Sequence, residues 1–426
     1  MINKEYRMRS KAGSFHIAGV VVAAALVGAT AAQGAGFALY EMSARGNALG
    51  GTLVGMTGDA SANYYNPANL TQNKGLQVEA GASMIGPKTE ITTLVPTPVG
   101  PAKLTTENKA RWWVPPHAYA SLQTSEKTWV GIGIYSPFGL GSVFDNDWVG
   151  RYNSYRAVIE TVDVNPNVAY KVDEKLSLAV GLQIVTFNLD LKRKLPNSVV
   201  PGGPDFDFEL KGDSVGYGGN AAASYQFTDK FGMGLVYRSE VGETLKGDAN
   251  VTAFGRKMGT DGEGDITLPA STALGANYKT GKLMLGAAVT YTEWSSYDEL
   301  RVKFSNPALL GRSESVTEKD WNNVWRYAAG AEYALSDMLD VRCSYVFDED
   351  PIPNKTADYL VPSNDRHLFG VGAGVHMNRY RLDLGYTYLL IEDRDNVPGR
   401  LAEGVFPSSY KDGYAHILAA SLSAVF

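Results

Sequence analysis

The sequence predicts an all-β transmembrane barrel of 14 antiparallel strands, closed around an N-terminal plug that we call the hatch. Three observations support this fold class. The chain begins with the charged, apolar and small-residue order of an export signal, its later segments alternate as membrane strands do, and it stops on an alternating strand that ends at Phe426. Bacterial outer-membrane barrels close with such a strand, because an aromatic side chain suits the membrane–water interface.

Residues 1–34 are predicted to be a signal peptide. Basic residues up to Lys11 precede an apolar stretch from about Ile17 to Val27, and small residues follow. This apolar run is shorter than the ~20 residues that a membrane-spanning helix needs, which argues against an N-terminal anchor. We expect cleavage after Gly34, with cleavage after Ala32 as the alternative.

Residues 35–75 are predicted to form the hatch, because a barrel of 14 strands is too wide for its own side chains to fill. This segment alternates poorly and is rich in glycine and other turn formers. Its last part contains Asn66-Pro67-Ala68, where an asparagine before a proline favours a turn. A disordered periplasmic tail is the alternative interpretation. The same tripeptide recurs at 306–308, where we expect an ordinary loop turn.

Residues 76–426 are predicted to form the barrel. Short polar turns alternate along the chain with longer links rich in proline and glycine, such as 197–207, 255–264 and 354–364. This is the pattern of periplasmic turns and extracellular loops in bacterial barrels. Fourteen strand-like segments begin near Leu76, Trp112, Thr128, Tyr155, Leu176, Lys211, Phe231, Asp265, Leu283, Trp321, Leu339, Arg366, Tyr380 and Gly413.

A run of kink-forming residues, Ser136-Pro137-Phe138-Gly139-Leu140-Gly141, interrupts the third of these strands. Pro137 cannot donate to a sheet ladder, and Gly139 and Gly141 weaken pairing and permit a bulge. We therefore expect a kink in the barrel wall here. The alternative is the outer end of a strand entering a loop, since the polar run Asp145-Asn146-Asp147 follows soon after.

The composition excludes several function classes. The net charge of -6 comes without a basic run of the kind that binds nucleic acid. The single cysteine, Cys343, cannot form an intrachain disulfide and is expected to be a small packed residue in a strand. The acidic run Asp348-Glu349-Asp350 is expected at a solvated rim, and no spacing of metal ligands is present. We expect neither a metal nor a cofactor.

Three rival classes remain for such a barrel. An outer-membrane lipase needs a converging serine, histidine and polar orienter, but the sequence shows no such constellation around the four histidines beyond the signal. We assign no catalytic residue. A general porin needs an open polar lumen, which the hatch argues against. A structural or adhesive barrel is the third rival.

Several separated motifs resemble those of the FadL-type family of long-chain fatty acid transporters, which also includes uptake channels for aromatic hydrocarbons. They cover essentially the whole mature chain, in the family's order. The fold that this resemblance implies, a 14-strand barrel with an N-terminal hatch, agrees with the independent strand count. The motifs are Ala35-Gly36-Phe37-Ala38-Leu39-Tyr40-Glu41, Asn66-Pro67-Ala68, Trp113-Val114-Pro115, Phe138-Gly139-Leu140, Tyr237-Arg238-Ser239-Glu240-Val241, and Phe347-Asp348 with Pro351 and Pro353.

The resemblance implies a bacterial outer-membrane channel for passive uptake of hydrophobic molecules, with long-chain fatty acids as the first choice. A substrate would enter from outside, bind near the hatch motif Asn66, Pro67 and Ala68, and leave into the membrane through a lateral gate at the kinked third strand. The implied partners are hydrophobic small molecules and outer-membrane lipid, not nucleic acid, and we expect a monomer. The gate residues would be Pro137, Phe138, Gly139, Leu140 and Gly141.

Three substrate-binding residues follow from the resemblance. Phe37 matches an aromatic residue that closes the internal pocket, Phe138 belongs to the kink, and Arg193 matches a basic residue that could bind a carboxylate. Simple hatch packing is the alternative for Phe37, and a solvated basic rim is the alternative for Arg193.

The sequence also departs from the fatty acid transporters of that family. The family's lysine just before the strand with Arg326 is Asn322 here, and the link from Leu195 to Leu210 is short. These departures put a second cation and an external capture groove in doubt. Uptake of monoaromatic hydrocarbons such as toluene, by the same mechanism, is therefore the alternative function.

Overall fold

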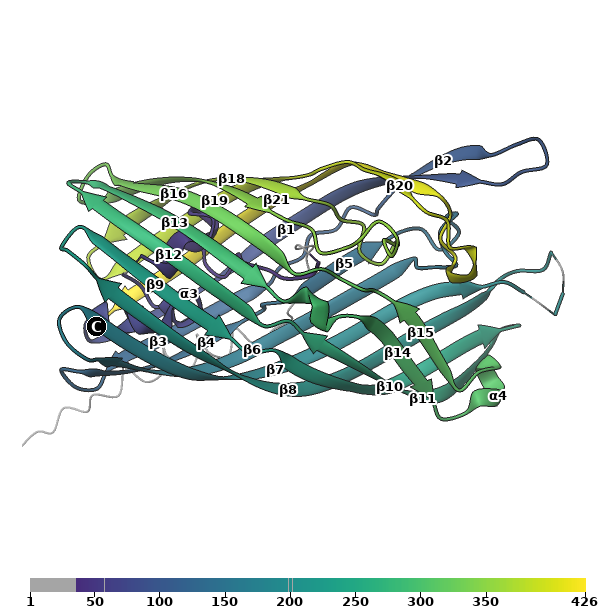
Figure 1. Ribbon diagram of the computed structural model, residues 1–426, viewed down its shortest axis with the longest axis horizontal. Helices are drawn as coiled ribbons and strands as arrows, with labels where there is room; N and C mark the ends of the chain where they lie inside the picture. The colour runs from purple at the N-terminus through teal and green to yellow at the C-terminus, as the bar shows by residue number, and fades with distance from the viewer. Residues whose placement is uncertain (1–35, 57, 198, 201) are drawn as a thin grey trace, which may run out of the picture.

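The barrel wall consists of 14 antiparallel strands that close on themselves (Figure 1). The computed structural model describes residues 36–426 except 57, 198 and 201, so the predicted signal peptide lies outside the described residues. The first strand, β1 (Leu76–Val95), pairs with the last, β21 (Ser408–Val425), and this pairing closes the sheet. The predicted fold class is confirmed.

The 14 barrel strands comprise 21 segments, because seven of them are each built from two segments. The segments between β1 and β21 are β2 (Ala102–Glu107), β3 (Pro116–Gln123), β4 (Thr128–Tyr135), β5 (Gly139–Val143), β6 (Arg156–Lys171), β7 (Leu176–Leu195), β8 (Phe206–Gln226), β9 (Phe231–Arg238), β10 (Val241–Ala253), β11 (Arg256–Leu268), β12 (Ser271–Thr280), β13 (Leu283–Thr292), β14 (Glu299–Phe304), β15 (Glu314–Glu318), β16 (Val324–Ala334), β17 (Leu339–Asp348), β18 (Arg366–Met377), β19 (Tyr380–Ile391) and β20 (Arg394–Val397).

Alternation along the strands sorts side chains between the lumen and the membrane. In β21, Ala415 and Ile417 are buried against the lumen contents, whereas Leu418 and Leu422 are 45% and 52% exposed on the outer face. The expectation that Cys343 is a packed residue is wrong. Its neighbour Arg342 faces the lumen, so alternation along β17 places Cys343 on the exposed outer face.

Short turns lie at the end of the barrel where the chain terminates, and longer connections lie at the other end (Figure 1). One predicted long link, 255–264, is wrong. Residues from Arg256 onward form β11, and Phe254 and Gly255 make a tight turn with φ of 51° and 74°. Residues 256–264 have one large apolar side chain, that of Met258, so no apolar alternation marks them as strand.

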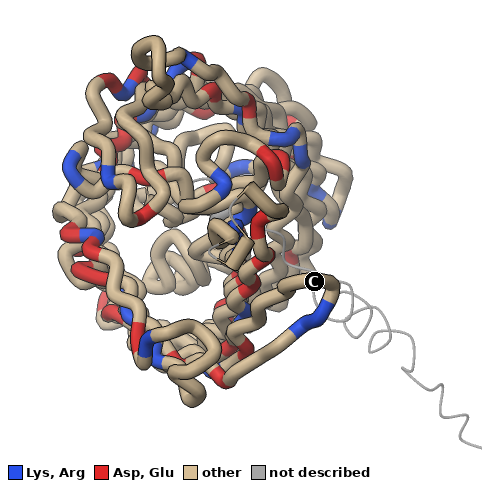
Figure 2. The backbone as a smooth tube through the Cα atoms, turned by 90° about the vertical axis from the view of Figure 1, so that its right-hand side faces the viewer, with Lys and Arg blue, Asp and Glu red and all other residues tan. Residues whose placement is uncertain are grey.

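Residues 36–75 lie inside the barrel, toward the end with the short turns (Figures 1 and 2). They form four short helices that contact the wall on many sides: α2 (Ala44–Ala48), η1 (Thr52–Val54), α3 (Ala62–Tyr65) and η2 (Pro67–Gln72). A Cβ added at Gly55 would lie 2.7 Å from the backbone of β12, so the glycine permits this close approach. Among the described residues, no helix is both long and apolar enough to cross a membrane.

The link 349–365 folds into the opposite mouth of the barrel. Tyr359 is fully buried, and its hydroxyl donates to the carbonyl of Phe406 at 3.2 Å. Asp348 and Asp350 are buried in ion pairs with Arg366 and Arg394, so their expected place at a solvated rim is wrong. The remaining helices are η3 (Trp294–Ser296), α4 (Pro307–Leu310) and η4 (Leu401–Glu403).

Candidate functional site

An apolar cavity lies in the middle of the barrel, next to the hatch. Inward-facing aliphatic and aromatic side chains from many strands make most of its lining, as the period-2 pattern of the strands requires. We call it the apolar cavity. Its main apolar lining residues are Phe37, Ile159, Phe187, Leu189, Leu191, Leu210, Leu245, Ile266, Tyr297, Leu300, Val302, Trp321, Leu360 and Val361.

Phe37 closes the hatch end of the apolar cavity and is 1% exposed. Its ring centroid lies 4.7 Å from that of Trp294, 5.7 Å from Trp321 and 6.0 Å from both Tyr297 and Phe138. Edge-to-face contacts of this kind stabilise an aromatic cluster beyond simple burial. The structure thus brings Phe37 and Phe138 together, in line with their predicted places.

Sequence reasoning missed three members of this cluster, Trp294, Tyr297 and Trp321. Trp294 starts η3 after β13, and Tyr297 ends it. The only sequence signal for this site was Trp294 at the end of an alternating strand, and a tryptophan at that position is equally expected at the membrane–water interface. Only the closure of the barrel brings this segment against Phe37.

A second cavity lies toward the long loops and shares Leu191, Leu210 and Leu300 with the apolar cavity. We call it the outer cavity. Arg193 lines it because it continues the inward-facing row of Phe187, Leu189 and Leu191 on β7.

Two arginines line the outer cavity without a carboxylate partner. Among the described residues, no acidic oxygen lies within 4.0 Å of Arg193 or of Arg312 from the β14–β15 loop, whereas the neighbouring Lys192 pairs with Glu209. The Arg193 guanidinium lies over the ring of Phe208, 5.2 Å from its centroid. Arg193 is therefore not one member of a solvated basic rim; it is a half-buried cation facing a cavity.

A third cation lies where the outer and apolar cavities meet. Lys319 lines both, and its Nζ lies 2.6 Å from Asp358 Oδ2, with both side chains 4% exposed. Asp358 belongs to the inward-folded link 349–365. Although Asn322 replaces the family's lysine, Lys319 brings a lysine to the junction of the two cavities. Its charge is neutralised by Asp358, a partner that the sequence alone does not reveal.

The third barrel strand is broken as expected. β4 pairs with β6 up to Tyr135–Asp163, and pairing resumes at Gly139–Glu160, so three residues oppose two and form a bulge. At the break, Phe138 N donates to Thr161 Oγ1 at 3.1 Å, and the same hydroxyl donates to the Phe138 carbonyl at 2.7 Å. A side chain thus replaces the missing ladder bonds.

Beyond the break, β5 pairs with β6 alone among the described strands. Its free edge turns toward the hatch: Leu39 N donates to the Pro137 carbonyl and Gly139 N to the Phe37 carbonyl, each at 2.8 Å. A Cβ at Gly141 would lie 2.1 Å from the ring of Trp113, so the indole covers this part of the opening. Leu140 lies within β5. The wall is interrupted between β3 and β5, and the segment around Phe37 fills part of the interruption.

The hatch motif ties the hatch to the wall. The Asn66 side chain donates to the carbonyls of Val54 at 2.9 Å and Ala223 at 3.2 Å, and accepts from Ala68 N at 3.0 Å. Pro67 begins η2, where its missing N–H costs nothing, and Ala68 is fully buried. Asn306 makes the same bond to Ala308 N in an exposed loop, so position alone separates the two copies.

Asn66→Leu is expected to destabilise the hatch by about 2–4 kcal/mol, because three hydrogen bonds are lost and buried carbonyls lose their donor. Hydrogen–deuterium exchange of the hatch amides would rise accordingly. Asn306→Leu is the matched control and should leave this exchange unchanged. Equal exchange in both variants and the wild type would contradict the assignment.

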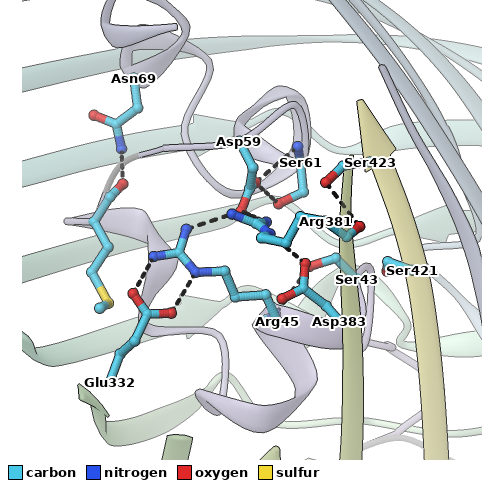
Figure 3. A network of polar contacts seen from close by, with 12 residues as sticks. Ser43, Arg45, Asp59, Ser61, Asn69, Glu332, Arg381, Asp383, Ser421 and Ser423 are labelled. Atoms are coloured by element: carbon cyan, nitrogen blue, oxygen red, sulfur yellow. Dashed lines mark hydrogen bonds and ion pairs between the residues drawn. The ribbon is translucent and has the colours of Figure 1, made fainter. Parts of the chain in front are cut away.

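A ring of six alternating charges also joins the hatch to the wall. Figure 3 labels all of its members except Arg342. Arg45 and Asp59 come from the hatch, and the other four charges come from β16, β17 and β19. Three positive and three negative groups balance, as burial of charge requires. The contacts, in order, are Arg45–Glu332 (2.8 Å), Glu332–Arg342 (2.6 Å), Arg342–Asp383 (2.7 Å), Asp383–Arg381 (2.6 Å), Arg381–Asp59 (2.9 Å) and Asp59–Arg45 (2.9 Å).

Comparison with known proteins agrees with this architecture. Residues 25–426 match the family described as "Outer membrane protein transport protein (OMPP1/FadL/TodX)". The chain is 27% identical over 410 residues to the 47 kDa outer membrane protein of Pasteurella multocida, covering 87% of this chain and 90% of that protein. It is 25% identical over 413 residues to the long-chain fatty acid transport protein of Escherichia coli O6:H1, with coverage of 87% and 90%.

Solved structures show the same fold. A Pseudomonas aeruginosa FadL homologue has a TM-score of 0.81 at 20% identity, over 92% of this chain and 99% of that chain. The Pseudomonas putida toluene transporter TodX has a TM-score of 0.71 at 18% identity, over 92% and 99%. The resemblance found in the sequence is confirmed: the chain belongs to the OMPP1/FadL/TodX family of outer-membrane transport proteins.

Proposed function

We propose that the protein is a passive channel that takes up long-chain fatty acids across the outer membrane and releases them sideways into the membrane. One observation carries this proposal. The outer cavity, with its two unpaired arginines, continues into the apolar cavity, which ends at the aromatic contact between Phe37 and Phe138 beside the broken third strand. A charged mouth followed by an apolar chamber fits a carboxylate with a long tail. No chemical step is involved, so no cofactor is needed, and a single copy of the barrel suffices.

The two arginines favour a fatty acid over an uncharged substrate. Charge-assisted hydrogen bonds to a carboxylate are about twice as strong as neutral ones. Arg193 and Arg312 have no competing acid within 4.0 Å among the described residues, whereas Lys319 is already paired with Asp358. In this proposal the head group binds in the outer cavity and the tail extends toward Phe37.

Uptake of monoaromatic hydrocarbons is the second candidate. It is favoured by the aromatic cluster at Phe37, Trp294 and Trp321, and by the pairing of Lys319 with Asp358, which leaves the apolar cavity itself without a free cation among the described residues. The similar fold of a toluene transporter is compatible with it.

We propose lateral release because release of an acyl chain into the aqueous periplasm would cost more free energy. Burial of each methylene group is worth ~0.8 kcal/mol, so a long acyl chain strongly resists release into the periplasm. The hatch fills the periplasmic end, through Asn66 and the charge ring around Arg45. The interruption at Pro137–Gly141 offers a path that never leaves an apolar environment. We therefore assign residues 36–75 as the hatch and 137–141 as the lateral gate.

Uptake of radiolabelled oleate and of toluene by cells carrying the protein tests the proposal. Arg193→Met with Arg312→Met should reduce oleate uptake by about 10–100-fold at low concentration, since hydrogen bonds to a charged group are lost. Toluene uptake should not change. Toluene uptake alone in the wild type would favour the hydrocarbon function, and uptake of neither would refute both.

A further inference from the structure

A third cavity lies on the far side of the aromatic contact from the apolar cavity. We call it the exit cavity. Pro137 and Phe138 of the broken strand line it, together with Gln183 and Arg238. Because Phe37 lines the apolar cavity and Phe138 lines the exit cavity, the Phe37–Phe138 contact separates the two.

Arg238 brings a positive charge to the exit cavity. Its guanidinium lies over the ring of Tyr64, 4.7 Å from the centroid, and donates to the Tyr64 carbonyl. Among the described residues no carboxylate lies within 4.0 Å of it. Asp163 faces the same region and partly offsets this charge, but its oxygens accept instead from Ile184 N at 3.2 Å and from the Gln183 side chain at 3.3 Å.

Gln183 supplies an unused polar atom beside Arg238. The side chain is 4% exposed, and its amide nitrogen is the end that binds Asp163. Its amide oxygen is buried and has no hydrogen-bond partner among the described residues. Buried polar atoms without partners are rare and costly, and they mark places where a ligand or water completes the bonding.

We infer that the exit cavity is a second head-group subsite, where Arg238 and Gln183 bind the carboxyl group of a fatty acid whose tail has already entered the membrane. This inference rests on the proposed function. A molecule bound in the outer cavity points its tail at Phe37, so the tail passes the aromatic contact first and the head group follows. A carboxylate accepts from the arginine, and a protonated carboxyl group also donates to the free oxygen of Gln183.

The subsite has a physical purpose. A polar head group that crosses the apolar wall without partners carries the full penalty of an unmade hydrogen bond. Arg238 and Gln183 provide partners at the last position before the break in the wall. The head group can thus remain hydrogen-bonded until the tail is inserted in lipid.

Arg238→Met is expected to reduce oleate uptake by about ten-fold, in line with the loss of hydrogen bonds to a charged group, while Arg238→Lys keeps most of it. Toluene has no head group, so its uptake should not change. Equal loss of both substrates in Arg238→Met would mean that Arg238 only fastens the hatch through Tyr64, and would overturn the inference. No oleate uptake by the wild type would instead refute the proposed function itself.

A direct measurement separates the two subsites even if toluene is not carried. Purified protein loaded with oleate labelled with carbon-13 at its carboxyl group should show two bound carboxyl signals by NMR. Arg238→Met should remove one, and Arg193→Met should remove the other. A wild-type spectrum with one bound signal, or two signals that both survive Arg238→Met, would mean that the exit cavity holds water only.

Discussion

A disulfide between positions 38 and 138 is expected to abolish uptake, and a reducing agent is expected to restore it. Ala38 and Phe138 form an isolated antiparallel bridge between the hatch and the broken strand. The bonds from Leu39 N to Pro137 and from Gly139 N to Phe37 flank this pair, so it is a non-hydrogen-bonded pair. Such pairs have Cα atoms ~4.5 Å apart, within the range that a disulfide spans.

The physical reason is that the cross-link fixes the hatch backbone beside Phe37 to the broken strand at position 138. The proposed path from the apolar cavity to the gate runs between these two segments, where the rings of Phe37 and Phe138 lie 6.0 Å apart in the wild type. The variant would carry Ala38→Cys, Phe138→Cys and Cys343→Ser, because Cys343 is an exposed free thiol. Oleate uptake would be compared before and after reduction, with formation of the bond confirmed by mass spectrometry.

The control is a pair of cysteines at Ala287 and Ala329, which are direct partners on β13 and β16 and lie on the exposed face. A disulfide there joins strands that already pair, so uptake should be unchanged. If the oxidised 38–138 variant is fully cross-linked and still takes up oleate at the rate of its reduced form, passage between the hatch segment around Phe37 and the broken strand is refuted.

The sequence predicted the barrel well because its strongest signal is local. Alternation of period two is a property of each strand by itself, and all 14 strands were found, although β8 and β11 extend further outward than their apolar pattern shows. Where a stretch of strand is polar on both faces, as in residues 256–264 of β11, alternation disappears and the sequence does not distinguish strand from loop.

The site was predictable only in part, because its residues meet through closure of the barrel. Arg193 was proposed from the family resemblance alone, and its row with Phe187 and Leu191 on β7 explains why it lines the outer cavity. Arg312 and Lys319 were not predicted as site residues, because the place of each depends on how the loops fold over the mouth of the barrel. Asp358 and Lys319 are 39 residues apart in sequence, and no local pattern links them.

The charge ring shows the same limit more strongly. Glu332, Arg342 and Asp383 each face the lumen from a different strand, where an isolated charge contradicts the apolar expectation. Their balance depends on Arg45 and Asp59, more than 200 residues away along the chain. A charge on the lumen side of an alternating strand is thus a useful signal, but its partner has to come from the fold.

Breaking this ring at Arg45 should have the second large effect. Arg45→Met leaves Asp59 and Glu332 buried with one cation each, and removal of one partner from a buried ion pair costs about 3–5 kcal/mol. Because Arg45 is the only cation of the ring that the hatch contributes, the hatch should loosen from β16. We expect faster hydrogen exchange in α2 and a higher conductance for small ions in planar bilayers, since residues 36–75 occupy the lumen toward the end with the short turns.

Two comparisons make this result specific. Lys411→Met removes a one-third-exposed ion pair with Asp393, and exposed pairs of this kind contribute only ~0–1 kcal/mol, so hatch exchange should stay the same. Arg45→Met combined with Glu332→Met removes opposite charges together and leaves Arg342–Asp383 and Arg381–Asp59 intact. The double variant should therefore be less perturbed than Arg45→Met alone. If the two substitutions simply add, the ring does not act as a unit, and the hatch must be fastened by Asn66 and its hydrogen bonds instead.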